Sequence, residues 1–203
     1  MSHARGTRET PAEARARRAA VDDPAAVLEA AARYLEARPR SVAEVRRRLG
    51  EAGYRAELVE GAIERLVDLG MLDDAAFARA WVESRDRSRP RGARALRDEL
   101  RRMGVPAEDV ERALAAREAM ATGEGDDDPD LSADGARASS EASDADAAAR
   151  LLGRRGGPLL RETDPRRRRA KAYALLARNG FDPDVCRDAV VAWLGGAEAP
   201  GAN

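Results

Sequence analysis

The sequence contains few of the residues that most often carry chemistry. Among its 203 residues there is one cysteine, Cys186, and one histidine, His3. A single cysteine excludes an internal disulfide and a cysteine-based zinc site, and no Cys/His or Ser/His pairing can be assembled from the pattern. No Gly-x4-Gly-Lys-Ser/Thr stretch occurs, so there is no P-loop. We therefore expect a protein that is not an enzyme and that uses no metal or other cofactor.

Aromatic side chains and long apolar runs are also scarce. Aromatic residues make up 3% of the chain and charged residues 36%, which is too few apolar groups for one large core but enough for several small helical cores. No apolar run approaches the ~20 residues that span a membrane, and the beginning of the chain has no hydrophobic signal core. We expect a cytoplasmic monomer with no membrane partner.

Arginine, in contrast, is abundant. All of the 36 basic residues except Lys171 are arginines. The formal net charge is −1 only because acidic and basic stretches compensate for one another: residues 121–149 hold nine acidic residues and one arginine, whereas residues 150–203 hold eleven basic and six acidic residues. The small net charge therefore does not exclude binding to a polyanion.

A spacing pattern recurs three times along the chain. It reads Leu-x3-Gly-Φ-x4-Φ-x3-Φ, where Φ is apolar, and it begins at Leu49, Leu100 and Leu176. The glycine is expected to end a helix in the left-handed conformation, and the apolar residues after it are expected to hold the next helix against the first. Cys186 occupies one of these apolar positions, so we expect it to be buried and inert.

Capping signals complete the division of the chain into short helices. Asp23 and Pro24 begin one helix, and Ser41 and Glu44 have the spacing of a capping box for the next. In the last repeat we expect a first helix at 147–152 and a loop at 153–164. The sequence thus predicts an all-α protein of three tandem three-helix repeats. The predicted divisions are a disordered arm at 1–22, repeat 1 at 23–72, repeat 2 at 73–120, a disordered acidic linker at 121–143, repeat 3 at 144–195 and a disordered tail at 196–203.

The arginines of repeats 2 and 3 are the best candidates for a contact surface. Arg94, Arg97 and Arg101 follow one another at i, i+3 and i+7, which places them on one helix face. A second cluster lies in the first turns of a helix, where cations oppose the helix dipole. Such surfaces fit a polyanion or an acidic partner, although a solvated helix face with Asp98 and Glu99 as local partners explains the first cluster equally well. The candidate contact residues are Arg85, Arg87, Arg91, Arg94, Arg97, Arg101, Arg102, Arg166, Arg167, Arg168 and Lys171.

The aromatic residues do not suggest a second kind of nucleic-acid surface. At least four of the seven fit core positions of the helical pattern, so we do not expect a base-stacking platform.

An ordered set of residues resembles the signature of the RecX family, LDD-x2-FA-x2-WV-x2-R…G-x3-L-x2-EL-x3-GV. The matching residues are Leu72, Asp73, Asp74, Phe77, Ala78, Trp81, Val82, Arg85, Gly92, Leu96, Glu99, Leu100, Gly104 and Val105. Repeat 1 also fits, through Arg38, Ser41, Glu44, Val45, Leu49, Gly53, Ile63, Leu66, Gly70, Met71 and Leu72. Repeat 3 fits more weakly, through Lys171, Leu175, Arg178, Gly180 and Phe181.

This resemblance implies an elongated, curved arrangement of three three-helix units. Proteins of the RecX family are regulators of the RecA recombinase in DNA recombination, repair and the SOS response. The resemblance therefore implies a protein that binds the RecA filament on single-stranded DNA and suppresses its extension, ATPase, strand exchange and coprotease activities. Two alternatives stay open: a direct DNA-binding module of the helix-turn-helix type, and a helical-repeat scaffold for another protein. The acidic third helices count against the first, since a recognition helix should be basic.

Overall fold

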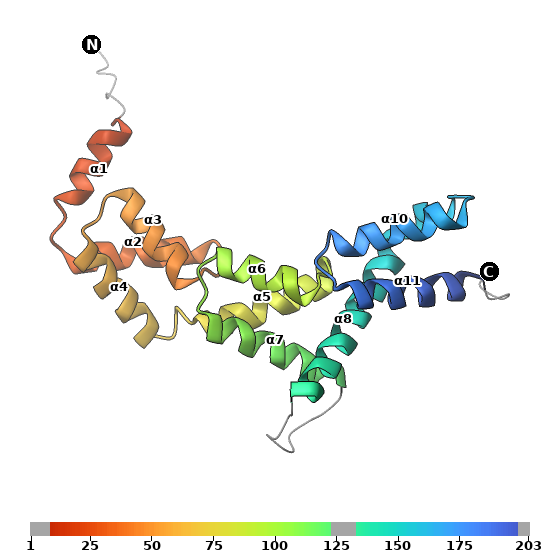
Figure 1. The fold of residues 1–203 in the computed structure, drawn as a ribbon. Coiled ribbons are helices and arrows are strands. Elements are labelled where there is room, and N and C mark those ends of the chain that lie inside the picture. The colour runs from red at the N-terminus through yellow and green to blue at the C-terminus, as the bar shows by residue number, and fades with distance from the viewer. Residues whose placement is uncertain (1–8, 123–132, 199–203) are drawn as a thin grey trace, which may run out of the picture. The chain divides into compact units, whose positions relative to one another are not determined.

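A computed structural model describes residues 9–122 and 133–198, and within these ranges every regular element is an α-helix (Figure 1). The predicted all-α class is confirmed. The helices are α1 (Pro11–Ala19), α2 (Pro24–Glu36), α3 (Val42–Ala52), α4 (Ala56–Asp68), α5 (Asp74–Ser88), α6 (Ala93–Arg102), α7 (Ala107–Thr122), α8 (Ala133–Arg155), α9 (Gly157–Leu160), α10 (Pro165–Ala177) and α11 (Pro183–Glu198). None of these helices is both long enough and apolar enough to cross a membrane.

The helices group into the three predicted repeats. Repeat 1 consists of α2, α3 and α4, repeat 2 of α5, α6 and α7, and repeat 3 of α8, α10 and α11. The middle helix of each repeat ends before a left-handed glycine, with φ of 101° at Gly53, 79° at Gly104 and 82° at Gly180, as the sequence predicts. Cys186 is fully buried, and burial raises the pKa of its thiol to about 11, so it stays protonated at neutral pH. The elongated, curved arrangement stays a prediction.

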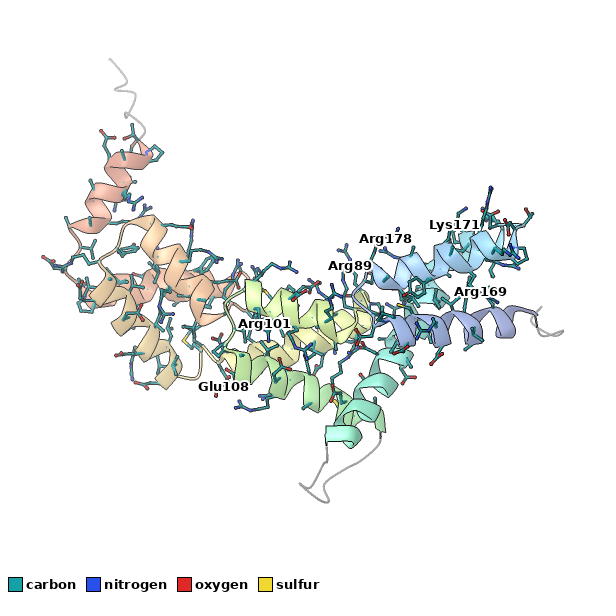
Figure 2. The ribbon with its side chains drawn as sticks, viewed as in Figure 1. Arg89, Arg101, Glu108, Arg169, Lys171 and Arg178 are labelled. Atoms are coloured by element: carbon teal, nitrogen blue, oxygen red, sulfur yellow. The ribbon has the colours of Figure 1, made fainter. Side chains whose placement is uncertain are left out.

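The chain forms two compact units. Unit 1 comprises Met1–Phe77 together with Met103–Val105, and unit 2 comprises Ala78–Arg102 together with Pro106–Asn203. Charged side chains project from the outer faces of the helices (Figure 2).

Unit 1 is built on an apolar core between α2, α3 and α4. Its buried members include Val27, Val45, Ile63 and Leu66. The predicted capping box at the start of α3 is confirmed: Ser41 Oγ accepts from the Glu44 N–H at 3.1 Å, and Glu44 Oε2 accepts from the Ser41 N–H at 3.3 Å.

Residues 103–105, which follow α6, and the start of α5 also contact the start of α3 within unit 1. The Ser41 hydroxyl donates to the Met103 carbonyl at 2.6 Å, and Asp74 Oδ1 accepts from the Val42 N–H at 3.0 Å. A Cβ placed on Gly104 would lie 2.3 Å from the Ala43 Cβ, so no other residue fits there. Glycine at this position therefore serves both the helix end and the contact.

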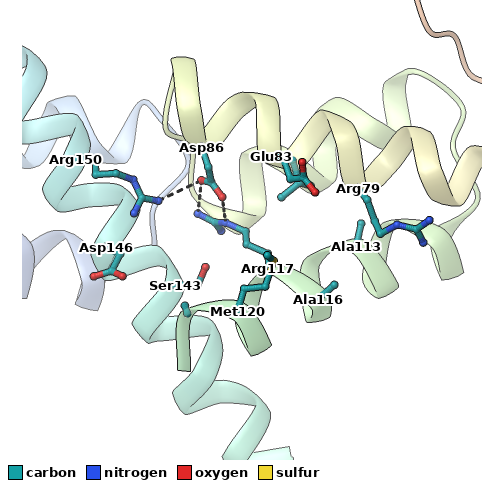
Figure 3. A pocket seen from close by; sticks show the side chains of 12 residues that line it. Arg79, Glu83, Asp86, Ala113, Ala116, Arg117, Met120, Ser143, Asp146 and Arg150 are labelled. Carbon is teal, nitrogen blue, oxygen red and sulfur yellow. Dashed lines mark hydrogen bonds and ion pairs between the residues drawn. The ribbon is translucent and has the colours of Figure 1, made fainter. Parts of the chain in front are cut away.

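Unit 2 contains a buried ionic network centred on Arg117 of α7. Its guanidinium donates to Asp86 of α5 at 2.9 and 3.1 Å and to Asp144 of α8 at 2.7 Å, while Arg150 of α8 lies 3.6 Å from Asp86 (Figure 3). Asp144 in turn accepts from the first N–H of α6, that of Ala93, with both carboxylate oxygens at 3.1 Å. Three helices and the start of a fourth are thus joined by two nearly buried charges.

The expected disordered arm at 1–22 is wrong for Pro11–Ala19, which form α1. Thr10 Oγ1 accepts from the Glu13 N–H, and the Glu13 carboxylate accepts from the Thr10 N–H. Pro11 occupies the first helical position. This capping box supplies partners for N–H groups that the helix cannot satisfy internally. Residues 1–8 lie outside the described part of the chain.

The expected linker at 121–143 and the short helix at 147–152 are also wrong in part, because α8 extends over Ala133–Arg155. Ser143 and Asp144 of α8 are buried. Asp144 is bonded to the start of α6 and to Arg117 of α7, and these bonds stabilise the helix in this polar segment. The expected loop at 153–164 contains the last residues of α8 and the short α9. The expected tail at 196–203 begins inside α11, which ends at Glu198. Residues 123–132 and 199–203 lie outside the described ranges.

Candidate polyanion-binding site

A basic depression lies between α6 and α10 in unit 2, with a volume of about 300 Å³. We call it the α6–α10 depression. Its charged lining consists of four arginines and two acidic residues: Arg91, Arg94, Arg102, Arg178, Asp98 and Glu99. Three of the arginines are sequence candidates, and the fourth, Arg178, is not.

Two glycines bring the walls of the depression together. A Cβ on Gly92 would lie 2.2 Å from the Gly180 carbonyl oxygen, and a Cβ on Gly180 would lie 2.3 Å from the Ala95 Cβ. The Gly92 N–H donates to the Asn179 carbonyl at 3.0 Å, and Arg91 Nη1 donates to the Asn179 side chain at 3.0 Å. Any larger residue at either glycine would separate the start of α6 from the end of α10, and with it Arg178 from the arginines of α6.

Two of the predicted contact residues are held mainly by Glu99. This carboxylate accepts from Trp81 Nε1 at 2.9 Å and from Arg85 Nε at 2.7 Å, and it lies 3.6 Å from Arg91. The Arg85 guanidinium also stacks over the Trp81 ring, 4.1 Å from its centroid. Arg85 therefore has a structural role in repeat 2, and Arg91 forms the floor of the depression.

Two further candidates on α6 are paired with Glu111 of α7. Arg97 donates to both Glu111 oxygens, at 2.8 and 2.9 Å, and Arg101 lies 3.5 Å from the same carboxylate. The hydrogen bond from Arg97 lowers the pKa of Glu111, so the carboxylate is charged at neutral pH. Arg97 and Arg101 do lie on the common helix face that the sequence predicts, but an acidic partner on the neighbouring helix occupies that face.

The same ion pair occurs in repeat 1. Arg46 donates to both oxygens of Glu60 at 2.7 Å. In both repeats the arginine lies seven residues before the left-handed glycine and the glutamate seven residues after it. This pair therefore belongs to the construction of the repeat and not to a site for a ligand.

Arg94, Arg102 and Arg178 remain. All three are exposed, and none forms an ion pair with any residue in 9–122 or 143–198. Figure 2 shows Arg178 at the end of α10. Arg102 and Arg178 occupy equivalent repeat positions, two residues before Gly104 and Gly180. That equivalence is the sequence signal that could have identified Arg178.

The remaining candidates lie outside the α6–α10 depression. Arg87 is exposed on α5, with Glu83 4.0 Å away. In the cluster on α10, Arg167 lies 3.6 Å from Asp164, and Lys171 is paired with Glu162. Arg166 is exposed, and its N–H donates to the Asp164 side chain, which caps the helix. Arg168 is half-buried. Two acidic side chains thus offset much of the charge that the sequence places at this helix start.

Four arginines within one depression have the chemistry to bind phosphates or carboxylates. Arginine donates from two parallel N–H groups and stays charged at all physiological pH values. Among the described residues no group of three or more His, Cys, Asp or Glu side chains is placed to hold a metal ion.

Comparison with known proteins matches two segments of the chain to known three-helix domains. The model of the first three-helix domain of RecX matches residues 28–66, and that of the second three-helix domain of RecX matches residues 73–114. These segments lie within repeats 1 and 2.

Several relatives are similar to the chain in sequence. The regulatory protein RecX of Mycobacterium ulcerans (strain Agy99) is 33% identical over 162 residues, which cover 80% of this chain and 81% of the relative. That of Mycobacterium sp. (strain KMS) is 45% identical over 83 residues, 41% of this chain and 45% of the relative. That of Prosthecochloris aestuarii is 44% identical over 81 residues, 40% of this chain and 54% of the relative. The chain thus spans about half the length of the last two.

A solved structure is similar to the chain in fold. The crystal structure of RecX from Lactobacillus salivarius superposes with a TM-score of 0.64 over 86% of this chain and 97% of the other, at 18% identity. At so low an identity the likeness shows the fold alone.

Proposed function

The chain belongs to the RecX family of regulatory proteins, and we propose that it modulates the RecA recombinase, chiefly as an inhibitor. In this proposal it binds the RecA–single-stranded DNA filament in the cytoplasm and suppresses filament extension, ATPase, strand exchange and coprotease activity. Such a role needs contacts along a polyanion-bearing partner and no catalytic group of its own. It belongs to DNA recombination and repair and to the SOS response.

One observation carries the assignment of the contact surface. Arg94, Arg102 and Arg178 come from two repeats, converge on the α6–α10 depression and are without ion pairs within the described residues. Holding exposed like charges together is unfavourable unless an anion compensates for them. The filament offers such anions as DNA phosphates and as acidic side chains of RecA. We therefore assign the filament contact to these three arginines, with Arg91 as their support.

The experiment is a titration of DNA-dependent RecA ATPase with the full chain. We expect inhibition near stoichiometric amounts, and we expect R94A/R102A/R178A to raise the half-inhibitory concentration about tenfold, equivalent to ~1.4 kcal/mol of binding free energy. R47A/R65A/R161A removes the same charge from exposed arginines outside the depression and should inhibit like the unaltered protein. If the unaltered protein leaves the ATPase rate unchanged, the proposed function is wrong. If both triple variants inhibit equally, the contact surface is wrong.

A further inference from the structure

Unit 1 carries a second basic surface, at the point where α1 meets α2 and α3. Two adjoining grooves of about 570 and 400 Å³ lie there and share Arg18, Arg48 and Ala52 in their walls. Their charged and aromatic lining comprises Arg15, Arg18, Arg33, Arg48, Tyr34, Tyr54 and Glu51. We call this surface the α1 groove.

The α1 groove exists because α1 docks on the end of α3. A Cβ on Gly53 would lie 2.5 Å from the Cγ of Arg15 and 2.9 Å from its carbonyl oxygen, so the backbone of α1 rests directly on this glycine. Arg18 Nη1 donates to the Ala52 carbonyl at 3.4 Å. These contacts place Arg15 and Arg18 of α1 beside Arg48 of α3, from which they are 33 and 30 residues distant in the chain.

The charges of the α1 groove are poorly compensated. Arg33 is paired with Glu29, but Arg15, Arg18 and Arg48 form no ion pair with the residues that the structure describes. Glu51 is the single acidic residue in the described walls, and it lines only the larger groove.

Aromatic rings distinguish the α1 groove from the α6–α10 depression, whose described lining has none. The Tyr34 ring lies under two guanidinium groups, with Arg40 4.3 Å and Arg48 5.8 Å from its centroid. A guanidinium stacked on a ring keeps its N–H edge available to a phosphate. Tyr54 lines the smaller groove and is only half-buried. Arginines that follow a backbone beside an aromatic ring are typical of surfaces that bind single-stranded nucleic acid.

We propose that the α1 groove binds single-stranded DNA directly, with Arg15, Arg18 and Arg48 on consecutive phosphates and Tyr54 against an unpaired base. A duplex presents phosphates but no free base face, so it satisfies only the arginines. The sequence pattern predicts no base-stacking surface, because at least four of the aromatic residues fit core positions. Tyr34 and Tyr54 do pack against the core of unit 1, but at its border, where part of each ring stays accessible. The proposal concerns DNA without RecA and goes beyond the proposed function.

The test is a fluorescence anisotropy titration of labelled oligothymidylate with the full chain in the absence of RecA. R48A alters an exposed residue of α3 that takes no part in the docking of α1, and R47A alters its neighbour on the same helix. We expect R48A to weaken binding several-fold and to reduce the magnitude of the slope of log K against log salt by about 0.7, whereas R47A changes neither. R15A/R48A should reduce that magnitude by about 1.4, with circular dichroism to verify that the helix content is kept.

A second variant tests the single-strand preference. We expect Y54L to weaken binding to oligothymidylate but not to a duplex, without a change of salt slope, because it removes a ring and no charge. Equal binding by R48A and R47A would overturn the site. A duplex bound as tightly as the single strand, with Y54L silent, would overturn the preference and leave a surface for polyanions in general. Since RecA is absent, these results are independent of the ATPase titration.

Discussion

The starts of α3 and α6 are capped by the same chemical group in different surroundings. In unit 1 the Val42 N–H donates to Asp74, and in unit 2 the Ala93 N–H donates to Asp144. The α3 start also has its own capping box at Ser41, whereas α6 follows Gly92, which has no side chain to offer. Asp74 is half-buried, and Asp144 is 4% exposed.

The difference explains why unit 2 needs Arg117. A carboxylate that supports a helix start from the surface is solvated by water. A buried carboxylate needs a buried cation beside it, because otherwise the cost of removing its charge from water lowers the stability of the fold. Arg117 supplies that cation and at the same time binds Asp86. Helix α6, which has no capping side chain of its own, is thus stabilised by a buried ionic network.

The largest effect is expected from R117M, which keeps an unbranched side chain but removes the guanidinium and leaves Asp144 buried without its partner. Breaking a buried ion pair from one side costs about 3–5 kcal/mol. Urea unfolding would measure the loss. R112M is the control, because Arg112 lies on the same helix but is exposed and, within the part of the chain that the structure describes, paired only with Asp109. If R117M and R112M are equally stable, the network contributes nothing to unit 2.

A smaller effect should separate the two capping carboxylates directly. D144N leaves one acceptor for Ala93 but removes the charge that faces Arg117, and we expect a loss of about 2 kcal/mol. D74N leaves the Ser41 capping box in place and should cost about 0.5 kcal/mol. Urea unfolding of the two variants side by side measures both losses of stability. Losses of equal size would contradict the distinction between the capping carboxylates of α3 and α6.

The two kinds of carboxylate should also respond to pH in opposite directions. Burial raises the pKa of Asp144 in spite of its bond to Arg117. Its folded pKa therefore exceeds its unfolded pKa, and the stability from this group is present at low pH and lost as the pH rises through the folded value. The hydrogen bonds from Arg46 and Arg97 lower the pKa values of Glu60 and Glu111, whose contribution is present above the unfolded pKa and lost as the pH falls.

This predicts a contrast between variants in urea unfolding as a function of pH. As the pH falls from neutrality, the free energy of unfolding of the unaltered protein should rise relative to that of D144N. Over the same interval, the free energy by which the unaltered protein is more stable than E60Q/E111Q should become smaller. The second effect is the smallest expected here, about 0.5 kcal/mol per pair, because these ion pairs are largely exposed. Parallel curves for the two variants would contradict the assignment.

Local signals were sufficient for much of the fold. The capping box at Ser41, the three left-handed glycines and the burial of Cys186 follow from spacing and chemistry within a few residues. The capping box at Thr10 is equally local, but the polar composition of residues 1–22 led to the prediction of a disordered arm.

Long-range pairings could not be predicted. Nothing near Arg117 or Asp144 in the sequence indicates that they meet across 27 positions. The same is true of the candidate sites: spacing grouped Arg94 with Arg97 and Arg101, whereas tertiary contacts group it with Arg102 and Arg178. Which arginines are paired depends on the acidic residues of neighbouring helices, and a single helix does not contain that information.

The left-handed glycines are also points of close contact with an element that comes earlier in the chain. Gly180 lies against Ala95 of α6, Gly104 lies against Ala43 of α3, and Gly53 lies against Arg15 of α1. Ala43 and Ala95 belong to the middle helix of the preceding repeat, whereas Arg15 belongs to α1, so at Gly53 α1 takes the place that a middle helix takes at the other two glycines. A further repeat placed before repeat 1 would therefore have to displace α1 from Gly53 before its own middle helix could pack there.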